Sequence, residues 1–212
     1  MCDQNPLLDH LIHVIPVLTD DEVNELNEYI DTHGSFEPCT TFGDDSSDAP
    51  PKVSGGRTST GWNLPDSSPI KQKIHLKLNQ AIDEYKRRLV DFHSSYDRFP
   101  LPGSNNTVSE HEHLQIIQYT KGQEYGFHHD NSDIQKHKEY NRQLSVIVYL
   151  NDDFEGGATR FLYTSTEDMA MKPPKGSAII FPSNWCFKHQ GDPVESGKKR
   201  ILVTWYYTTT ID

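Results

Sequence analysis

Three side chains in two remote segments have the types and spacing of a metal site. His128 and Asp130 are two residues apart in the stretch EYGFHHD, which has the pattern of a strand end. Side chains two apart on an extended chain point the same way, so this imidazole and this carboxylate can converge on one point. A third donor, His189, follows a separate apolar run that ends at Phe181. Two histidines and one carboxylate leave open positions on a metal, which suits non-haem iron(II) binding a cosubstrate and oxygen.

A lysine that follows these donors could complete a site for an oxo acid. Iron(II) with one carboxylate ligand keeps a net positive charge, which would attract the keto-acid end of a 2-oxo acid. The far carboxylate of that molecule needs a buried cation, because burying a carboxylate without a partner is very costly. Lys199 begins a strand-like run that reaches Trp205, and its neighbour Arg200 should face the other side of that strand. The sequence therefore predicts Lys199 as the cation.

Two amphipathic helices are predicted ahead of these segments, where they could support them. Thr19 and Glu22 have the spacing of a capping box, and the helix that follows should end at His33–Gly34. Ser68 and Pro69 then provide a helix cap and a proline in the first turn. Apolar residues recur every three or four positions after them and predict the clearest helix of the chain, at Ile70, Ile74, Leu78, Ile82, Tyr85 and Leu89.

Short strand patterns separated by glycine- and proline-rich turns dominate the second half of the chain. The later strands are expected at residues 114–119, 125–130, 144–150, 159–163, 177–181 and 200–208. Before them, we expect a strand at 11–18, a surface loop at 43–56 and a long connection at 96–109. Helices first and many short strands afterwards predict an α+β fold, namely a two-sheet sandwich or jelly roll with helices packed on one sheet.

Length and composition favour one domain with a real core. The chain has 212 residues, of which 34% are hydrophobic and 10% aromatic. We expect a single domain over residues 1–212, with helical support to about residue 110 and a metal-binding core at about 111–209.

Charge and cysteine content limit the expected binding partners and cell compartment of the protein. The formal net charge is −11, so attraction to phosphate backbones is not expected and nucleic acid is a poor partner. The three cysteines are widely spaced and indicate free thiols in a reducing compartment. The sequence shows neither a secretion signal nor a long apolar run. We therefore expect a cytoplasmic protein without a membrane partner, as a monomer or weak dimer.

A combination of spaced motifs resembles a known family. The chain is similar to the prolyl 4-hydroxylases within the iron(II)- and 2-oxoglutarate-dependent dioxygenases, over roughly residues 11–207. Each motif is weak alone, but their joint order and spacing are specific. They are Arg57-Thr58-Ser59, Glu112-x-x-Gln115, Gln118-Tyr119-x-x-Gly122-x-x-Tyr125-x-x-His128-x-Asp130, Arg142, Tyr149-Leu150, Glu155-Gly156-Gly157-x-Thr159, Pro174-x-Gly176-x-Ala178, His189, Lys199 and Trp205.

The resemblance implies a double-stranded β-helix and a role for each matching position. His128, Asp130 and His189 would be the iron ligands. The partners of 2-oxoglutarate would be Lys199, on the distal carboxylate, together with Tyr119 and Thr159. The residues that handle a peptide substrate near the metal would be Tyr125, Arg142, Trp205 and Glu112.

The stretch after the double glycine departs from the family pattern. Ala158 and Arg160-Phe161 replace an acidic residue and a Phe-Pro pair, and the stretch around Trp185-Cys186-Phe187 is more aromatic than expected. The segments 43–56 and 131–141 do not match closely either. These differences leave the iron and oxo-acid chemistry intact but make the identity of the hydroxylated residue an open question.

The implied reaction is hydroxylation of a peptidyl proline. It would use Fe(II), 2-oxoglutarate and O2, with ascorbate as reductant, and release succinate and CO2. The partner would be a proline-containing peptide or protein, basic or neutral around its target because the segment 43–48 is acidic. Two alternatives stay open: the same chemistry on another side chain, a free amino acid or a small metabolite, and a noncatalytic jelly roll that binds a ligand or zinc.

Overall fold

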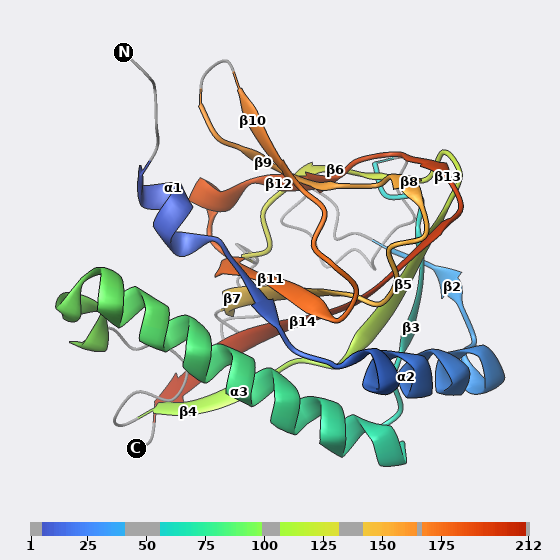
Figure 1. Ribbon diagram of the computed structural model, residues 1–212, viewed down its shortest axis with the longest axis horizontal. Coiled ribbons are helices and arrows are strands. Elements are labelled where there is room, and N and C mark those ends of the chain that lie inside the picture. The colour runs from blue at the N-terminus through green and yellow to red at the C-terminus, as the bar shows by residue number, and fades with distance from the viewer. Residues whose placement is uncertain (1–5, 41–55, 99–106, 132–141, 165–166, 211–212) are drawn as a thin grey trace, which may run out of the picture.

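The computed structural model describes residues 6–40, 56–98, 107–131, 142–164 and 167–210 (Figure 1). Its helices are α1 (Pro6–Leu11), α2 (Asp20–His33) and α3 (Pro69–Phe92), with short 3-10 turns η1 (Ser94–Arg98) and η3 (Trp185–Phe187). Its strands are β1 (His13–Pro16), β2 (Glu37–Pro38), β3 (Thr60–Asn63), β4 (Thr107–His111), β5 (Gln115–Thr120), β6 (Tyr125–His128), β7 (Arg142–Tyr149), β8 (Glu155–Gly156), β9 (Thr159–Leu162), β10 (Asp168–Met171), β11 (Ser177–Pro182), β12 (His189–Gly191), β13 (Val194–Ser196) and β14 (Lys198–Thr210).

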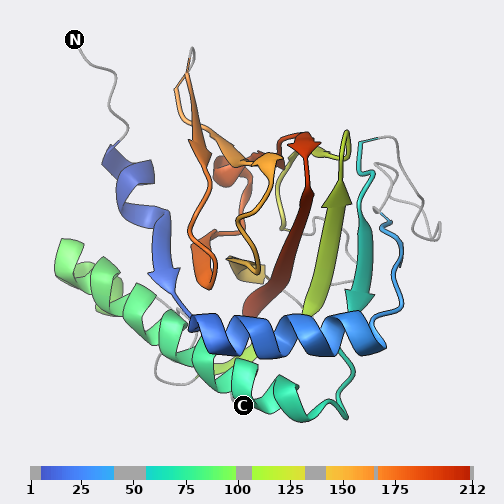
Figure 2. The same ribbon diagram turned by 45° about the vertical axis from the view of Figure 1, so that its right-hand side comes forward.

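Two helices cover one face of the larger sheet, as Figures 1 and 2 show. Helix α2 begins with the predicted capping box: the Thr19 side chain accepts from the Glu22 N–H, and the Glu22 carboxylate accepts from the Thr19 N–H at 2.9 Å. Helix α3 begins at the predicted proline and buries the predicted apolar stripe, including Leu78 and Tyr85. Both helices are therefore confirmed, and each buries one apolar face against the sheet. The predicted cap at Ser68 is not formed by its side chain, which makes no capping hydrogen bond.

The strands form two main antiparallel sheets that face each other. The larger has the order β1-β11-β7-β14-β5-β3-β2, with β4 also paired to β14, and the smaller has the order β10-β9-β12-β6. One apolar cluster lies between the helices and the large sheet, and a second includes Tyr119, Tyr149 and Phe161 on the opposite face. This jelly roll with helices on one sheet confirms the predicted fold class.

The N-terminal part differs in detail from what its sequence pattern predicts. The strand expected at 11–18 is shorter, since α1 ends at Leu11 and β1 covers only His13–Pro16. The long connection expected at 96–109 contains η1 and the start of β4, with part of it outside the described residues. The loop at 43–56 also lies almost wholly outside them. No helix in the described ranges is long and apolar enough to cross a bilayer.

Candidate metal centre

Strand pairing brings the three predicted metal donors together. His128 ends β6, and His189 begins the neighbouring β12 directly opposite it in the register. Their ring centroids are 4.3 Å apart. Asp130 follows β6 by two residues, and one ligand atom from each of the three side chains lies within 4.8 Å of the others.

Both imidazoles present the same nitrogen to the carboxylate. His128 Nδ1 lies 2.8 Å from the Gly126 carbonyl oxygen, and His189 Nδ1 lies 3.0 Å from that of Phe187. A carbonyl only accepts, so each Nδ1 carries a proton and each Nε2 keeps a lone pair for a metal. His128 Nε2 lies 3.5 Å from Asp130 Oδ1, and His189 Nε2 lies 3.5 Å from Asp130 Oδ2. Donors on one ion with bonds of about 2.1 Å are roughly 3.0–3.4 Å apart, so these residues fit a metal ion.

The Asp130 carboxylate is buried and held by its neighbours. Ser145 Oγ donates to Asp130 Oδ2 at 2.6 Å and contacts Ser183 Oγ at 2.9 Å. Burial alone would raise the pKa of Asp130, but His189, His128 and the Ser145 hydrogen bond outweigh it and hold that pKa well below its usual value. The carboxylate is therefore ionised and oriented before any ion binds.

His189 is neutral at physiological pH, as a metal ligand must be. Burial lowers the pKa of His189 to about 4, although the Asp130 charge acts in the opposite direction. The rings of Phe161 and Phe181 pack around it, with centroids at 5.7 and 4.7 Å. These rings keep water away from one side of the imidazole.

Lys199 is buried on the inner face of the large sheet, as predicted for a carboxylate-binding cation. Lys199 is only 1% exposed, and its Nζ donates to the Gly157 carbonyl oxygen at 2.7 Å. No other described residue forms a salt bridge with it. Burial lowers the pKa of Lys199 to about 7. The Asp192 charge opposes this effect without forming a salt bridge, so a bound carboxylate would relieve the remaining cost of the buried charge.

Gly157 lets the chain approach this lysine closely. Its φ is +61°, a conformation that favours glycine, and an added Cβ would lie 3.3 Å from Lys199 Cδ. The double glycine at 156–157 therefore makes the tight turn that its sequence predicts.

The other two predicted oxo-acid partners, Tyr119 and Thr159, are buried close by. The Lys199 Nζ lies 5.3 Å from the Tyr119 ring centroid and 4.9 Å from that of Tyr149. The Tyr149 hydroxyl and Thr159 Oγ1 are 2.8 Å apart. Strand β9 carries Thr159 opposite Gly191, two residues from His189. The Tyr149 and Thr159 hydroxyls thus belong to the surroundings of the lysine, on strands next to the one that carries His189 or across from it.

Three of the predicted substrate residues form one cluster beside the metal donors. Arg142 Nη2 donates to Glu112 Oε2 at 2.7 Å, and its guanidinium lies 3.8 Å from the Trp205 ring. Arg142 Nη1 also donates to the Asp130 carbonyl oxygen at 3.1 Å. The fourth, Tyr125, stacks on His128 with ring centroids 3.7 Å apart.

Three residues with clear contacts at the site had no assigned role in the sequence analysis. Ser145 orients Asp130, and Tyr149 binds Thr159 beside Lys199. Arg57 covers the outer side of Tyr125, with its guanidinium 4.7 Å from that ring. Ser145 and Tyr149 are the polar residues of the otherwise apolar run 144–150, four apart and on one face, which is the signal that could have found them.

Comparison with known proteins agrees with this geometry. Residues 114–207, which carry all three donors and Lys199, match the family described as the 2OG-Fe(II) oxygenase superfamily. This part, somewhat less than half of the chain, is similar to that superfamily. This similarity supports the oxygenase family expected from the spaced motifs.

Among the oxygenases in this superfamily, the chain is similar to proteins named as prolyl hydroxylases. A putative prolyl 4-hydroxylase of Acanthamoeba polyphaga mimivirus is 36% identical over 110 residues, which cover 45% of this chain and 44% of that protein. The matched segment therefore spans less than half of either protein.

Solved oxygenase structures share the fold over nearly the whole chain. A viral collagen prolyl hydroxylase from Paramecium bursaria Chlorella virus-1, in complex with 2OG, has a TM-score of 0.62 at 23% identity, covering 92% of this chain and 95% of that one. A Trichoplax adhaerens prolyl hydroxylase, in complex with a hypoxia-inducible factor peptide, has a TM-score of 0.65 at 18% identity, covering 96% and 86%. At this level of identity they support the double-stranded β-helix fold.

Proposed function

We propose that this protein is an Fe(II)- and 2-oxoglutarate-dependent dioxygenase that hydroxylates a peptidyl proline and releases succinate and CO2. The observation that carries the proposal is the pairing of two features on one face: a His128, Asp130 and His189 donor set, and a fully buried lysine that forms no salt bridge with a described carboxylate. A zinc-binding or purely structural jelly roll would have no use for that lysine.

In this proposal Lys199 binds the distal carboxylate of 2-oxoglutarate. Its amine would exchange an unfavourable unpaired state for a charge-assisted hydrogen bond. The hydroxyls of Tyr119 and Thr159 would donate to the same carboxylate. Tyr149 holds Thr159 through its 2.8 Å contact and so fixes the direction of that hydroxyl.

The three donors would hold Fe(II) through His128 Nε2, Asp130 and His189 Nε2. Fe(II), when bound, would supply the electron-transfer and oxygen chemistry that protein side chains lack. The chain's own part is orientation: two backbone carbonyls fix the imidazole tautomers, and Ser145 fixes the carboxylate. Phe161 and Phe181 limit the access of water to His189.

The substrate assignment rests on the cluster beside the donors and on the names of the relatives. Trp205 provides an apolar surface for a proline ring, and Arg142 can donate to a peptide carbonyl. Glu112 holds Arg142 in place through two contacts between its carboxylate and the guanidinium. The similar proteins from mimivirus and Trichoplax adhaerens are named as prolyl hydroxylases, which favours proline over a free metabolite.

Turnover of 2-oxoglutarate tests the proposal. Purified protein is incubated with Fe(II), ascorbate as the proposed reductant, O2 and proline-containing peptides, and both succinate and peptide mass are measured. We expect succinate from wild type, none from His189→Ala, a strongly raised 2-oxoglutarate requirement for Lys199→Ala, and wild-type behaviour from the exposed control His33→Ala. Absence of succinate from wild type would contradict the oxygenase, and succinate without any oxidised proline peptide would contradict the substrate.

A further inference from the structure

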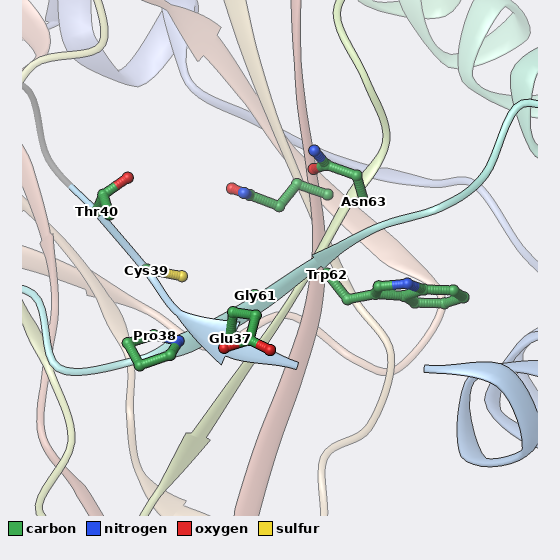
Figure 3. Close-up of a pocket in the computed structure, with 8 residues that line it drawn as sticks. Glu37, Pro38, Cys39, Thr40, Gly61, Trp62 and Asn63 are labelled. Carbon is green, nitrogen blue, oxygen red and sulfur yellow. The ribbon is translucent and has the colours of Figure 1, made fainter. Parts of the chain in front are cut away.

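A polar groove lies at the free edge of the large sheet, on the same face as the metal centre. It has a volume of about 180 Å³, and its lining includes Glu37, Cys39, Gly61, Asn63 and Gln115 from strands β2, β3 and β5 or their ends (Figure 3). Gln115 shares its face of β5 with residues 117 and 119, whose side chains pack in the core between the two sheets.

The other face of this edge is already filled. Figure 3 shows the Trp62 ring turned away from Cys39 and Thr40. Its ring packs instead near Phe36 and Tyr29, with centroids at 6.3 and 6.4 Å, on the helix-covered side. The groove is therefore open on the site side and closed by packed aromatic rings on the other.

Arg57 connects the groove to the metal centre. Its Nη2 donates to Gln115 Oε1 at 3.4 Å, and its Nη1 donates to the Thr40 carbonyl oxygen at 3.3 Å. The same guanidinium lies 4.7 Å from the Tyr125 ring, which stacks on His128 at 3.7 Å. Arg57 and Tyr125 thus connect the groove to the metal donor His128.

The groove offers backbone and side-chain groups that suit an extended peptide. Strand β2 pairs with β3 only at residues 60 and 61, so within the described chain no strand pairs with the outer edge of β3 at Trp62 or Asn63. An unpaired strand edge can accept another extended chain. The amides of Asn63 and Gln115 add donors and acceptors for a peptide main chain.

The charge of the groove selects among peptides. Glu37 is the acidic residue of the lining, it is exposed, and no described lysine or arginine forms a salt bridge with it. A carboxylate here would attract a lysine or arginine side chain and repel an acidic one.

We propose that this groove binds the segment of the peptide substrate next to the target proline, as an extended strand with a basic residue on Glu37. The inference rests on the proposed function and adds a sequence preference to it. An extended peptide advances roughly 3.3 Å per residue, so the position at which a basic residue reaches Glu37 is set by the length of peptide between the metal centre and the groove.

Binding of a peptide series in which the position of one lysine is varied tests the inference. Fluorescein-labelled Gly/Ser peptides carry one central proline and one lysine, placed up to about seven residues away on either side. Fluorescence anisotropy is measured on protein loaded with Zn²⁺ and 2-oxoglutarate, which should bind peptide without turnover. We expect one window of positions, on one side of the proline, where lysine tightens binding about two- to fivefold over alanine, as an exposed ion pair would.

Charge reversal at the groove provides the matched comparison. Glu37→Lys should remove the lysine preference and make a glutamate at the same position favourable, while Glu28→Lys, at an exposed position on α2, should leave the wild-type preference unchanged. Asn63→Ala should weaken all the peptides alike, because it removes a main-chain partner and no charge.

The outcomes separate this inference from the function on which it rests. If proline peptides bind and are hydroxylated but no lysine position matters, or if Glu37→Lys and Glu28→Lys behave alike, the groove assignment is overturned and the enzyme assignment stands. If no proline peptide binds or is oxidised at all, both are overturned.

Discussion

The Lys199 ammonium should control how oxo-acid binding depends on pH. Burial lowers the pKa of this amine to about 7 in the free protein. A bound carboxylate favours the charged form, so above pH 7 the lysine must take up a proton as 2-oxoglutarate binds. We predict that the affinity for 2-oxoglutarate is nearly constant below pH 7 and falls by up to about tenfold per pH unit above it. Calorimetric titrations between pH 6 and 9 measure this.

Lys199→Arg is the control for that pH dependence. Arginine stays charged throughout the range, so its affinity should not fall between pH 7 and 9, whatever its absolute value. A wild-type affinity that is flat over the same range would show that the Lys199 proton is not coupled to binding.

Ser145 should matter for metal affinity more than for folding. Its hydroxyl donates to Asp130 Oδ2 at 2.6 Å and so holds the carboxylate toward the two Nε2 atoms. We predict that Ser145→Ala weakens metal binding by about 10- to 100-fold, the usual effect of losing a group that orients a ligand. Competition with a fluorescent chelator measures the affinity, and circular dichroism checks the fold. An unchanged metal affinity in the folded variant would show that Ser145 does not orient the metal ligand.

At the scale of the elements, the local sequence pattern was enough to predict a helix or strand where the segment is long and has one clear apolar face. Helix α3 and strands β7, β11 and β14 are long amphipathic or apolar runs, and they were predicted with small errors at their ends. Strands β2, β8, β12 and β13 have two or three residues each and too few apolar positions to show a period. Their place comes from pairing with distant strands, which a local pattern does not contain.

The same limit applies to the metal donors. His128 and Asp130 could be paired from their spacing alone, because both lie on one short extended segment. His189 could be suggested as a metal ligand from its residue type, but its position opposite His128 depends on the register between β6 and β12. The role of Ser145 likewise depends on the large sheet lying behind Asp130, which no spacing along the chain reveals.

The stability of helix α3 should be separable from the metal centre. Leu78 is fully buried against the large sheet, whereas Leu76, two residues earlier on the same helix, is 57% exposed. We predict that Leu78→Ala lowers the free energy of unfolding by about 2–5 kcal/mol. Leu76→Ala should change it by less than about 0.5 kcal/mol. Urea unfolding measures the free energy of unfolding of both variants. Similar values would contradict the packing of Leu78 against the large sheet.

At the scale of the whole molecule, the site joins structures that are far apart in sequence. The small sheet supplies His128 and His189, while Ser145 on β7 and Lys199 on β14 belong to the large sheet. Glu112 and Arg142 add a link through the Asp130 carbonyl oxygen. An ion bound at the donors would therefore fasten one sheet to the other.

Removal of the metal should lower the stability of the whole domain. At a metal concentration about 100 times its dissociation constant, binding to the folded state stabilises it by about 2.7 kcal/mol. For a domain of this size that amounts to a rise in Tm of about 5–10 °C, measured by anaerobic thermal unfolding with Fe(II) and then with a chelator. Because His189 is buried in the donor set and His33 is exposed on α2, His189→Ala should lose this shift and His33→Ala should keep it. A shift of equal size in both variants would mean that the ion binds elsewhere and does not link the two sheets.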